Sequence, residues 1–204
     1  MFGEMLENVR RKSPLVHSIT NYVTVNDCAN MLLACGASPI MADEPGEVME
    51  ITSICDALNI NIGTLNSHTI PSMLAAGKQA RTLNHPIILD PVGAGTSLLR
   101  TQTALELLHE VKFTVVRGNI SEIHTLAAGS GSTRGVDAGA SERISEDNLE
   151  ETIAFVRAFA RELGAIAAIT GPIDVISDGF RPMLFAMAAR KWLPLPVPAA
   201  SFLH

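Results

Sequence analysis

Six short apolar runs follow one another along the chain, and a longer stretch with helical periodicity separates most of them from the next. Strands that alternate with helices in this way favour a largely parallel sheet, because parallel neighbours need long crossover connections. We therefore expect an α/β fold with a mainly parallel central sheet that is covered on both faces. The runs are PLVHSIT (14–20), SPIM (38–41), LNINIGT (58–64), PIILDPV (86–92), FTVVRGN (113–119) and AIAAITG (165–171).

The clearest helical pattern is SEDNLEETIAFVRAFARELG (145–164). Ser145 is the expected N-cap, acidic residues fill the first turns, and Gly164 is the expected stop. The low-complexity patch GSGSTRGVDAGASE (129–142) is expected to form a flexible surface loop. Helices are predicted over 22–35, 45–56, 71–84, 98–111, 119–128 and 146–163.

The composition is that of a soluble protein of one domain. Of the 204 residues 47% are hydrophobic, and the net charge of −6 argues against a nucleic acid or an anionic membrane as partner. Cys28, Cys35 and Cys55 form no CxxC pair and are expected to be buried, reduced thiols. Because the sequence has no signal peptide and no apolar run that could span a bilayer, a cytoplasmic location is expected.

Polar residues and glycines gather where the predicted strands end. Ligands of open parallel sheets bind outside the carboxyl ends of the strands, and packing does not explain this distribution. A lone histidine there is more often structural than catalytic, and we interpret His17 in that way. The residues at these ends are His17, Asn21, Met41, Gly63, Thr64, Asp90, Gly93, Gly95, Arg117, Asn119, Glu122, Thr170 and Gly171.

The run LDPVGAGTS (89–97) places Asp90 at a strand end, before a glycine-rich turn that opens a helix. Backbone N–H groups at a helix start attract phosphate. A dinucleotide-binding fingerprint would need a glycine where Leu98 stands, and no GxxxxGK[ST] motif occurs, so neither a Rossmann fingerprint nor a Walker P-loop is supported. Two roles stay open for Asp90, a metal ligand and a cap of the turn.

The run VVRGNISEI (115–123) is more informative. Asn119 and Glu122 lie three residues apart and share one helix face, so both can point into one site. Oxygen ligands suit magnesium, and Arg117 can pair with nucleotide phosphates. The alternative is a capping box, with Asn119 as N-cap and Glu122 as its partner. The two roles are compatible.

The run AITGPIDVISDG (168–179) is typical of a strand, a Thr-Gly turn and a second short strand. Thr170 either donates its hydroxyl to a nucleotide or stabilises the turn.

Taken together, these motifs resemble those of the hydroxyethylthiazole kinases, which belong to the ribokinase-like superfamily. The resemblance implies a three-layer α/β fold, usually in a homotrimer with sites between subunits. It also implies that ATP phosphorylates the hydroxyethyl group of 4-methyl-5-(2-hydroxyethyl)thiazole, a salvage step toward thiamine. The matching runs cover nearly all of residues 4–179 and are PLVHSITN, ANMLLACGASPIMA, INIGTL, ILDPVGAGTS, VVRGNISEI, GVDAG and AITGPIDVISDG.

The resemblance assigns roles to the residues at the strand ends. Phosphoryl transfer depends mainly on positioning and charge neutralisation, for which a magnesium ion, an arginine and amide donors are suited. The implied contacts are Asn21, Met41, Gly63 and Thr64 for the thiazole, Asp90 and Glu122 for magnesium, and Arg117 and Thr170 for ATP.

The resemblance fades near residue 180. Family members continue with a Thr-Gly-Thr-Gly-Cys segment that supplies an anion hole and the general-base position, and this sequence contains no TGTGC. Loss of an anion hole lowers a rate by about 10²–10³. Because the Cys of the family's general-base position is absent, no catalytic residue is assigned. We expect residues 1–180 to form an incomplete ribokinase-like kinase domain, with the C-terminal part missing, and residues 181–204 to be an aberrant proline-rich tail.

Three functions stay open on this basis. The first is a hydroxyethylthiazole kinase, and the second is a catalytically inactive remnant that only binds the thiazole. The third is another ribokinase-like kinase, such as a pyrimidine kinase, against which the thiazole-side motifs argue. Turnover of the thiazole alcohol with ATP separates the first two. Because helices that cover the sheet would be absent, we also expect poor solubility or abnormal assembly.

The ending RKWLPLPVPAASFLH (190–204) suits neither a helix nor a central strand, because three prolines lie within five positions. Its codons permit Thr-Gly-Thr-Gly-Cys when they are read one nucleotide earlier. A frameshift near residues 178–184 is therefore favoured over a natural proline-rich tail. Sequencing the gene decides between the two explanations.

Overall fold

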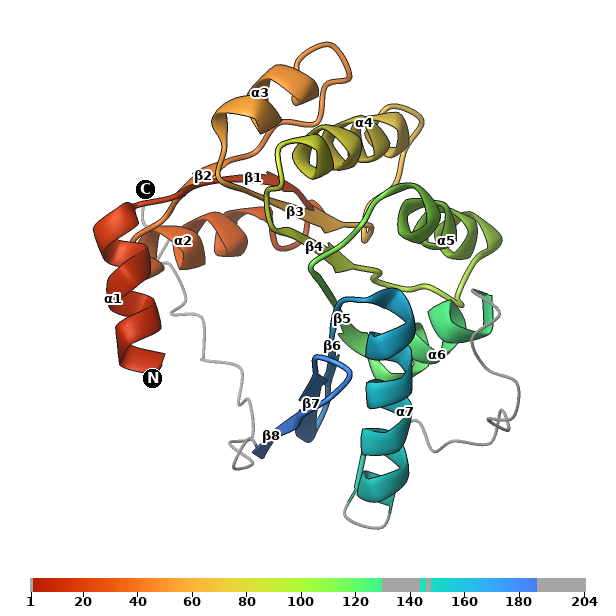
Figure 1. The fold of residues 1–204 in the computed structure, drawn as a ribbon. Helices are drawn as coiled ribbons and strands as arrows, with labels where there is room; N and C mark the ends of the chain where they lie inside the picture. Colours follow the sequence, from red (N-terminus) through yellow and green to blue (C-terminus); the bar gives the residue numbers. More distant parts are fainter. Residues whose placement is uncertain (1, 130–143, 146–147, 187–204) are drawn as a thin grey trace, which may run out of the picture.

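The computed structural model describes residues 2–129, 144–145 and 148–186. Within them, eight strands form one sheet in the order β2-β1-β3-β4-β5-β6-β7-β8 (Figure 1). Strands β1 to β6 pair in parallel, and β7 and β8 are antiparallel, so the predicted α/β fold with a mainly parallel sheet is confirmed. The strands are β1 Leu15–Ile19, β2 Ser38–Ile40, β3 Ala57–Asn61, β4 Ile87–Asp90, β5 Val115–Asn119, β6 Ile166–Thr170, β7 Ile173–Ser177 and β8 Pro182–Ala186.

Helices connect the parallel strands, as the crossover geometry requires. Each predicted strand and helix has its counterpart in the structure. Among the described residues, α1 and β8 are the two elements that the sequence did not predict. The helices are α1 Phe2–Lys12, α2 Val25–Cys35, α3 Val48–Ile54, α4 Thr69–Thr82, α5 Leu98–Glu110, α6 Ile120–Gly129 and α7 Leu149–Leu163.

The two ends of α7 differ in how well the sequence predicted them. Gly164 ends the helix in the left-handed conformation, with a φ of 62°, which a glycine adopts without strain. The prediction for Ser145 was wrong, because α7 begins at Leu149 after Asn148. The backbone N–H of Ser145 donates to Asn148 Oδ1 over 2.8 Å, which places Ser145 in the turn before the helix.

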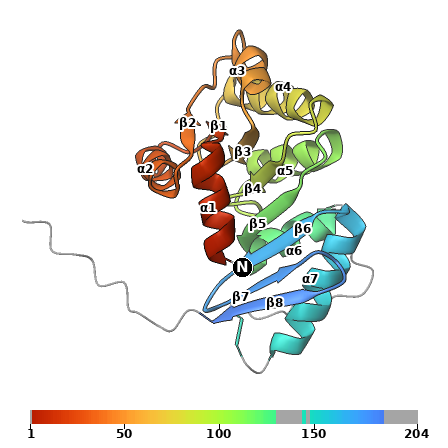
Figure 2. The ribbon, with the colours of Figure 1, turned by 60° about the vertical axis from the view of Figure 1, so that its left-hand side comes forward.

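The helices do not cover the two faces of the sheet equally (Figures 1 and 2). Helices α4, α6 and α7 pack on β3 to β7, whereas α2 packs beside β2 and α1 beside α2. Figure 2 shows α1 and α2 apart from the group that α3, α4 and α5 form. The side chains under α4, α6 and α7 form the centre of the core, and those of Leu58, Ile60, Leu89, Val116 and Ile169 are at most 1% exposed.

Several predictions fall wholly or partly outside the described residues. The low-complexity loop lies outside them except for Gly129, and so do residues 187–204 of the predicted tail. Residues 182–186 of that tail form β8, which pairs with β7. Among the described residues the three cysteines are free; Cys55 is buried, and the other two are half-buried. Within the same ranges, no helix combines the length and apolar character needed to cross a bilayer.

Candidate active site

Asp90 and Arg117 form the charged centre of the candidate site. They lie at the carboxyl end of β4 and near that of β5, and Arg117 Nη1 approaches Asp90 Oδ2 to 3.1 Å. The Asp90 side chain is 16% exposed and that of Arg117 is 53% exposed. Asn61 Nδ2, on the neighbouring strand β3, donates to the same carboxylate oxygen over 2.8 Å. Three adjacent strands therefore present one donor, one carboxylate and one cation at the same edge of the sheet.

The surroundings of Asp90 disfavour its charge. Burial raises the pKa of this carboxyl above its ordinary value of 3.8, and the nearby Glu122 carboxylate raises it further. The positive charge of Arg117 and the hydrogen bonds from Asn61 and Arg117 lower the pKa and oppose these effects. A buried carboxylate with incomplete compensation gains from a cation, because added positive charge favours its ionised form.

Asn21 and Gly63 line a cavity of about 700 Å³ at the same edge of the sheet. Asn21 Nδ2 donates to Asn61 Oδ1 over 3.0 Å, and the backbone N–H of Gly63 donates to the same oxygen over 2.8 Å. A Cβ at position 63 would lie 2.8 Å from Cβ of Asn21, so only glycine fits this approach. Asp90 and Arg117 also line the cavity, so four of the predicted residues share it.

The other two predicted thiazole contacts do not line that cavity. Thr64 Oγ1 accepts a hydrogen bond from the backbone N–H of Tyr22 over 3.3 Å, which ties the loop after β3 to the loop after β1. Met41 follows β2, and its residue is 36% exposed. The structure therefore places both on loops at the carboxyl ends of the strands, outside the cluster around Asp90.

Glu122 forms the predicted capping box at the start of α6. Its Oε2 accepts from the backbone N–H of Asn119, and Asn119 Oδ1 accepts from that of Glu122 in return, over 2.8 and 2.9 Å. Glu122 Oε1 accepts from the backbone N–H of Gly93 over 2.8 Å. The carboxylate therefore links the start of α6 to the glycine-rich turn after β4, and at 8% exposure it is buried.

Thr170 stabilises backbone at the end of β6. Its hydroxyl donates to the carbonyl of Gly118 over 3.3 Å, and the residue pairs with Asn119 across the β5–β6 register. This contact fits the turn-stabilising alternative. The half-buried hydroxyl lies at the same edge of the sheet as Asp90.

Two residues of the site, Arg100 and Asn61, were not predicted from the sequence. The guanidinium of Arg100 donates to three backbone carbonyls, those of Ile62, Gly63 and Val92, over 2.8 to 3.2 Å. It thereby joins the loop after β3 to the turn after β4. An arginine in the first turn of a helix looks like part of a solvated face, so the sequence gives no signal for it. Asn61 could have been recognised from the sequence, because asparagine is depleted in strands and Asn61 lies within a predicted strand.

The donor set around Asp90 is compatible with magnesium. Both hydrogen bonds to the Asp90 carboxylate go to Oδ2, and within the described residues Oδ1 has no protein donor. Magnesium in phosphate sites needs only one or two protein carboxylates, because waters and phosphates supply the other ligands. Among the described residues, no cluster of three or more His, Cys, Asp or Glu side chains is placed to hold a metal ion by itself.

His17 is structural, as we interpreted it. It is fully buried, its Nε2 donates to the carbonyl of Ala42 over 2.7 Å, and its Nδ1 lies 2.9 Å from Thr52 Oγ1. These contacts hold the start of the loop after β2 and one face of α3 against β1.

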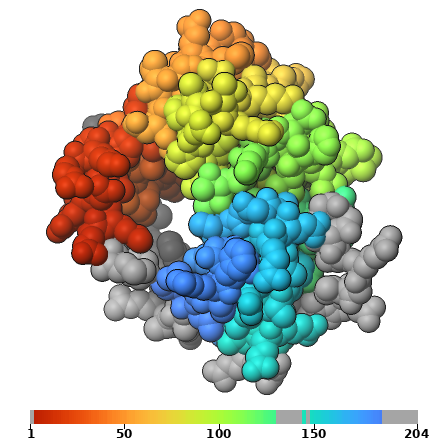
Figure 3. All heavy atoms as spheres, in the orientation of Figure 1, coloured from red at the N-terminus to blue at the C-terminus, as the bar shows by residue number. Residues whose placement is uncertain are grey.

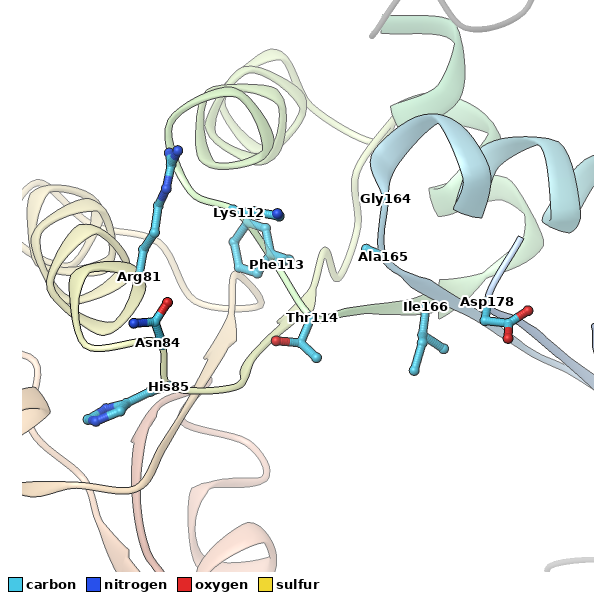
Figure 4. A pocket seen from close by; sticks show the side chains of 10 residues that line it. All are labelled: Arg81, Asn84, His85, Lys112, Phe113, Thr114, Gly164, Ala165, Ile166 and Asp178. Carbon is cyan, nitrogen blue, oxygen red and sulfur yellow. The ribbon is translucent and has the colours of Figure 1, made fainter. Parts of the chain in front are cut away.

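A second cavity, of about 450 Å³, lies at the opposite edge of the sheet, at the start of β5 and β6 (Figure 4). Its polar side chains do not converge, because Arg81 and His85 point away from each other. None of the residues predicted for the site lines it, and the cavity at the carboxyl ends of the strands is therefore the candidate active site.

A profile of the hydroxyethylthiazole kinase family matches residues 6–189. The chain belongs to the hydroxyethylthiazole kinase family. Curated hydroxyethylthiazole kinases from Clostridium acetobutylicum and Desulfovibrio desulfuricans are 65% and 51% identical to it, each over 87% of this chain. The chain spans 65% and 62% of the lengths of these two relatives.

Solved structures agree with this membership in the hydroxyethylthiazole kinase family. The hydroxyethylthiazole kinase protein of Pyrococcus horikoshii OT3 is 41% identical and has a TM-score of 0.78, over 89% of this chain and 65% of that one. An adenosine kinase from Schistosoma mansoni has a TM-score of 0.52 at 13% identity, over 90% of this chain and 63% of that one, which shows a shared fold only. The ribokinase-like fold that the sequence predicted is thereby confirmed.

Proposed function

We propose that the protein is an ATP-dependent kinase that phosphorylates the hydroxyethyl group of 4-methyl-5-(2-hydroxyethyl)thiazole, in thiamine salvage. The observation that carries this proposal is the single cavity that Asn21 and Gly63 share with Asp90 and Arg117. An alcohol bound beside Asn21 would share that cavity with the charged pair, because Asn61 hydrogen-bonds to both Asn21 and Asp90. Membership in the hydroxyethylthiazole kinase family supports the choice of alcohol.

Magnesium and ATP are the proposed cofactor and phosphoryl donor. Asp90 would hold the ion through its free oxygen, with Glu122 nearby, and the ion would neutralise charge on the phosphates. The half-exposed side chain of Arg117 can turn toward a phosphate, and Thr170 offers a hydroxyl at the neighbouring strand end. These groups bind and orient the substrates, which is what phosphoryl transfer asks of the protein.

The test is transfer of the γ-phosphate of labelled ATP to the thiazole alcohol by the full chain, with magnesium present. Phosphorylated thiazole in excess of a boiled control and of Asp90→Asn supports the kinase. The alternative, an inactive remnant, predicts calorimetric binding of the thiazole with no labelled product at any enzyme concentration. Absence of both binding and transfer contradicts both functions.

We also propose that the protein forms a homotrimer in the cytoplasm, and the surface of α2 supports self-association. No described residue of α2 is buried, and Met31 and Leu33 are 66% and 57% exposed. A helix that exposes large apolar side chains and has no buried residue is typical of a surface that another chain covers. Light scattering after size exclusion should give three times the mass of one chain, and Met31→Lys should lower it.

A further inference from the structure

The side chain of Asn61 lies between the two halves of the candidate active site. Its Oδ1 accepts from Asn21 Nδ2 over 3.0 Å and from the backbone N–H of Gly63 over 2.8 Å. Its Nδ2 donates to Asp90 Oδ2 over 2.8 Å. One amide group therefore contacts both the predicted alcohol side and the predicted metal side.

The neighbours of Asn61 fix the orientation of this amide. A backbone N–H can only donate, so the atom facing Gly63 must be the oxygen. The Asp90 carboxylate, when ionised, can only accept, so the atom facing it must be the NH₂ group. A flipped amide would set two donors against each other on one side and two acceptors on the other. The polarity of the contact is therefore determined by the fold.

The orientation of Asn61 in turn sets that of Asn21. Since Asn61 Oδ1 is an acceptor, the NH₂ group of Asn21 must face it. The oxygen of Asn21 then accepts from the backbone N–H groups of Val23 and Thr24, each over 3.0 Å. The hydrogen bonds run from the start of α2 through two asparagines to Asp90, and then to Arg117.

The strand register makes this connection rigid. Asn61 and Asp90 are directly opposite each other in the β3–β4 pair, and their side chains share one face of the sheet. Asn61 is only 7% exposed, so water does not compete for its bonds. Asn59, two residues earlier on the same face, donates instead to Ser18 Oγ over 3.0 Å.

We propose that Asn61 is a positioning residue that holds Asn21 and Asp90 in one arrangement, so that the bound alcohol and the magnesium-bound phosphate are aligned. This inference rests on the proposed function for the identity of the two ligands. Alignment of this kind matters because misplacement by about 1 Å can lower a rate by about a hundredfold.

The experiment compares two separate affinities in the full chain, that for the thiazole alcohol by calorimetry and that for Mn²⁺ alone by electron paramagnetic resonance. In Asn61→Ala, both affinities should fall by about tenfold, because Asn21 and Asp90 each lose a buried hydrogen bond. Asn21→Ala should lower only the alcohol affinity, and Asp90→Asn only the Mn²⁺ affinity. Ser177→Ala is the matched control, because it removes a buried side-chain hydrogen bond in β7, away from the cavity, and it should change neither affinity.

A readout independent of the proposed function is the side-chain amide signal of Asn21 in the NMR spectrum of ¹⁵N-labelled protein. It should shift in Asn61→Ala and stay in place in Ser177→Ala. An Asn61→Ala protein that melts cooperatively but loses one affinity only, or neither, overturns the inference. If the parent chain binds Mn²⁺ but not the alcohol, the proposed function fails, and the Mn²⁺ and NMR results alone decide on Asn61.

Asn61→Asp provides a second variant if the alanine variant does not fold. It keeps the acceptor oxygens that face Asn21 and Gly63 but has no amide to donate to Asp90. We expect near-parental affinity for the alcohol and a changed affinity for Mn²⁺. The reverse pattern, a lost alcohol affinity with unchanged Mn²⁺ binding, also overturns the inference.

Discussion

The two faces of the central sheet differ in what covers them. Under α4, α6 and α7, the side chains of alternate strand residues are almost completely buried, as Leu89 shows at 0% exposure. On the opposite face, Ile88 and Ile166 are 39% and 37% exposed, although each neighbours a buried residue on its own strand. Figure 3 shows a hollow between α1, in red, and β7 and β8, in blue.

This difference separates stability from function within single strands. The packed face holds the apolar core, whereas the open face carries Asn61, Asp90 and Arg117 at its carboxyl edge. Because side chains on the open face are less buried and include those of the candidate site, a substitution there should change ligand binding more than folding.

The largest expected effect is on the packed face. Leu89→Ala should lower the free energy of unfolding by about 2–5 kcal/mol, because it leaves a cavity among fully buried side chains. Its neighbour Ile88 points to the open face, and Ile88→Ala should cost about 1 kcal/mol or less. Urea unfolding followed by circular dichroism measures both. Equal losses in the two variants would contradict the comparison.

Gly63→Ala tests the crowded edge of the open face. The new Cβ would lie 2.8 Å from Cβ of Asn21 and 2.9 Å from Oδ1 of Asn61. Overpacking of this kind costs about 1–3 kcal/mol, and we expect the thiazole affinity to fall along with the stability. Gly46→Ala is the control, since its Cβ would meet nothing closer than 3.9 Å. Matching calorimetric titrations of the two variants would refute the crowding argument.

Glu122→Gln should have a moderate effect on stability and a larger one on turnover. The neutral amide sets an NH₂ group against one of two backbone N–H donors, those of Gly93 and Asn119. An unsatisfied buried donor costs about 1–3 kcal/mol. Turnover should fall much more than thiazole affinity, because the carboxylate is assigned to magnesium. Unchanged turnover would remove that assignment, and the kinase assay and calorimetry together give the answer.

The smallest expected effect is a dependence of stability on pH that comes from the packed face. Burial lowers the pKa of His17 below its ordinary value of 6.5, against the opposing hydrogen bond to Ala42 and the charge of Glu47. Burial likewise lowers the pKa of His124, which stacks on Phe155. The unfolded chain therefore binds these protons first, and the stabilising contribution is complete above pH 6.5 and lost as the pH falls below it.

Urea midpoints between pH 7.5 and 5.5 measure this loss. Asp90 acts in the opposite direction, because its raised pKa removes stability as the pH rises through it. The slope for His17 is therefore taken as the difference between the parent and His17→Gln, which lacks the titrating ring. Identical slopes in the two proteins would show that His17 contributes nothing.

The sequence predicted the elements well because their signals are local. Apolar runs and helical periodicity are properties of a few neighbouring residues, and the glycine after α7 acts within one turn. The N-cap of α7 was misplaced because SEDN offers several capping residues within four positions, and packing chooses among them. The strand ends also identified Asp90 and Arg117, because the parallel topology brings such ends together.

What the sequence did not predict depends on pairings between distant residues. The bonds of Arg100 go to carbonyls 8, 37 and 38 residues away, and backbone carbonyls carry no sequence signature. The link from Asn61 to Asp90 needs the β3–β4 register, which periodicity alone does not give. Likewise, the roles of Met41 and Thr64 come from the resemblance, and whether such loop residues line the cavity depends on loop conformation.

The two margins of the described sheet have opposite consequences for association between chains. Strand β2 has three residues, Ser38–Ile40, which offers too short a ladder for another strand to join. Strand β8 has five, and its Met183 and Leu184 are 42% and 46% exposed. Pro182 at its start removes one donor but leaves the rest of the strand able to pair. Growth of the sheet by a further strand, whether from the same polypeptide or from another molecule, is therefore favoured at β8 and hindered at β2.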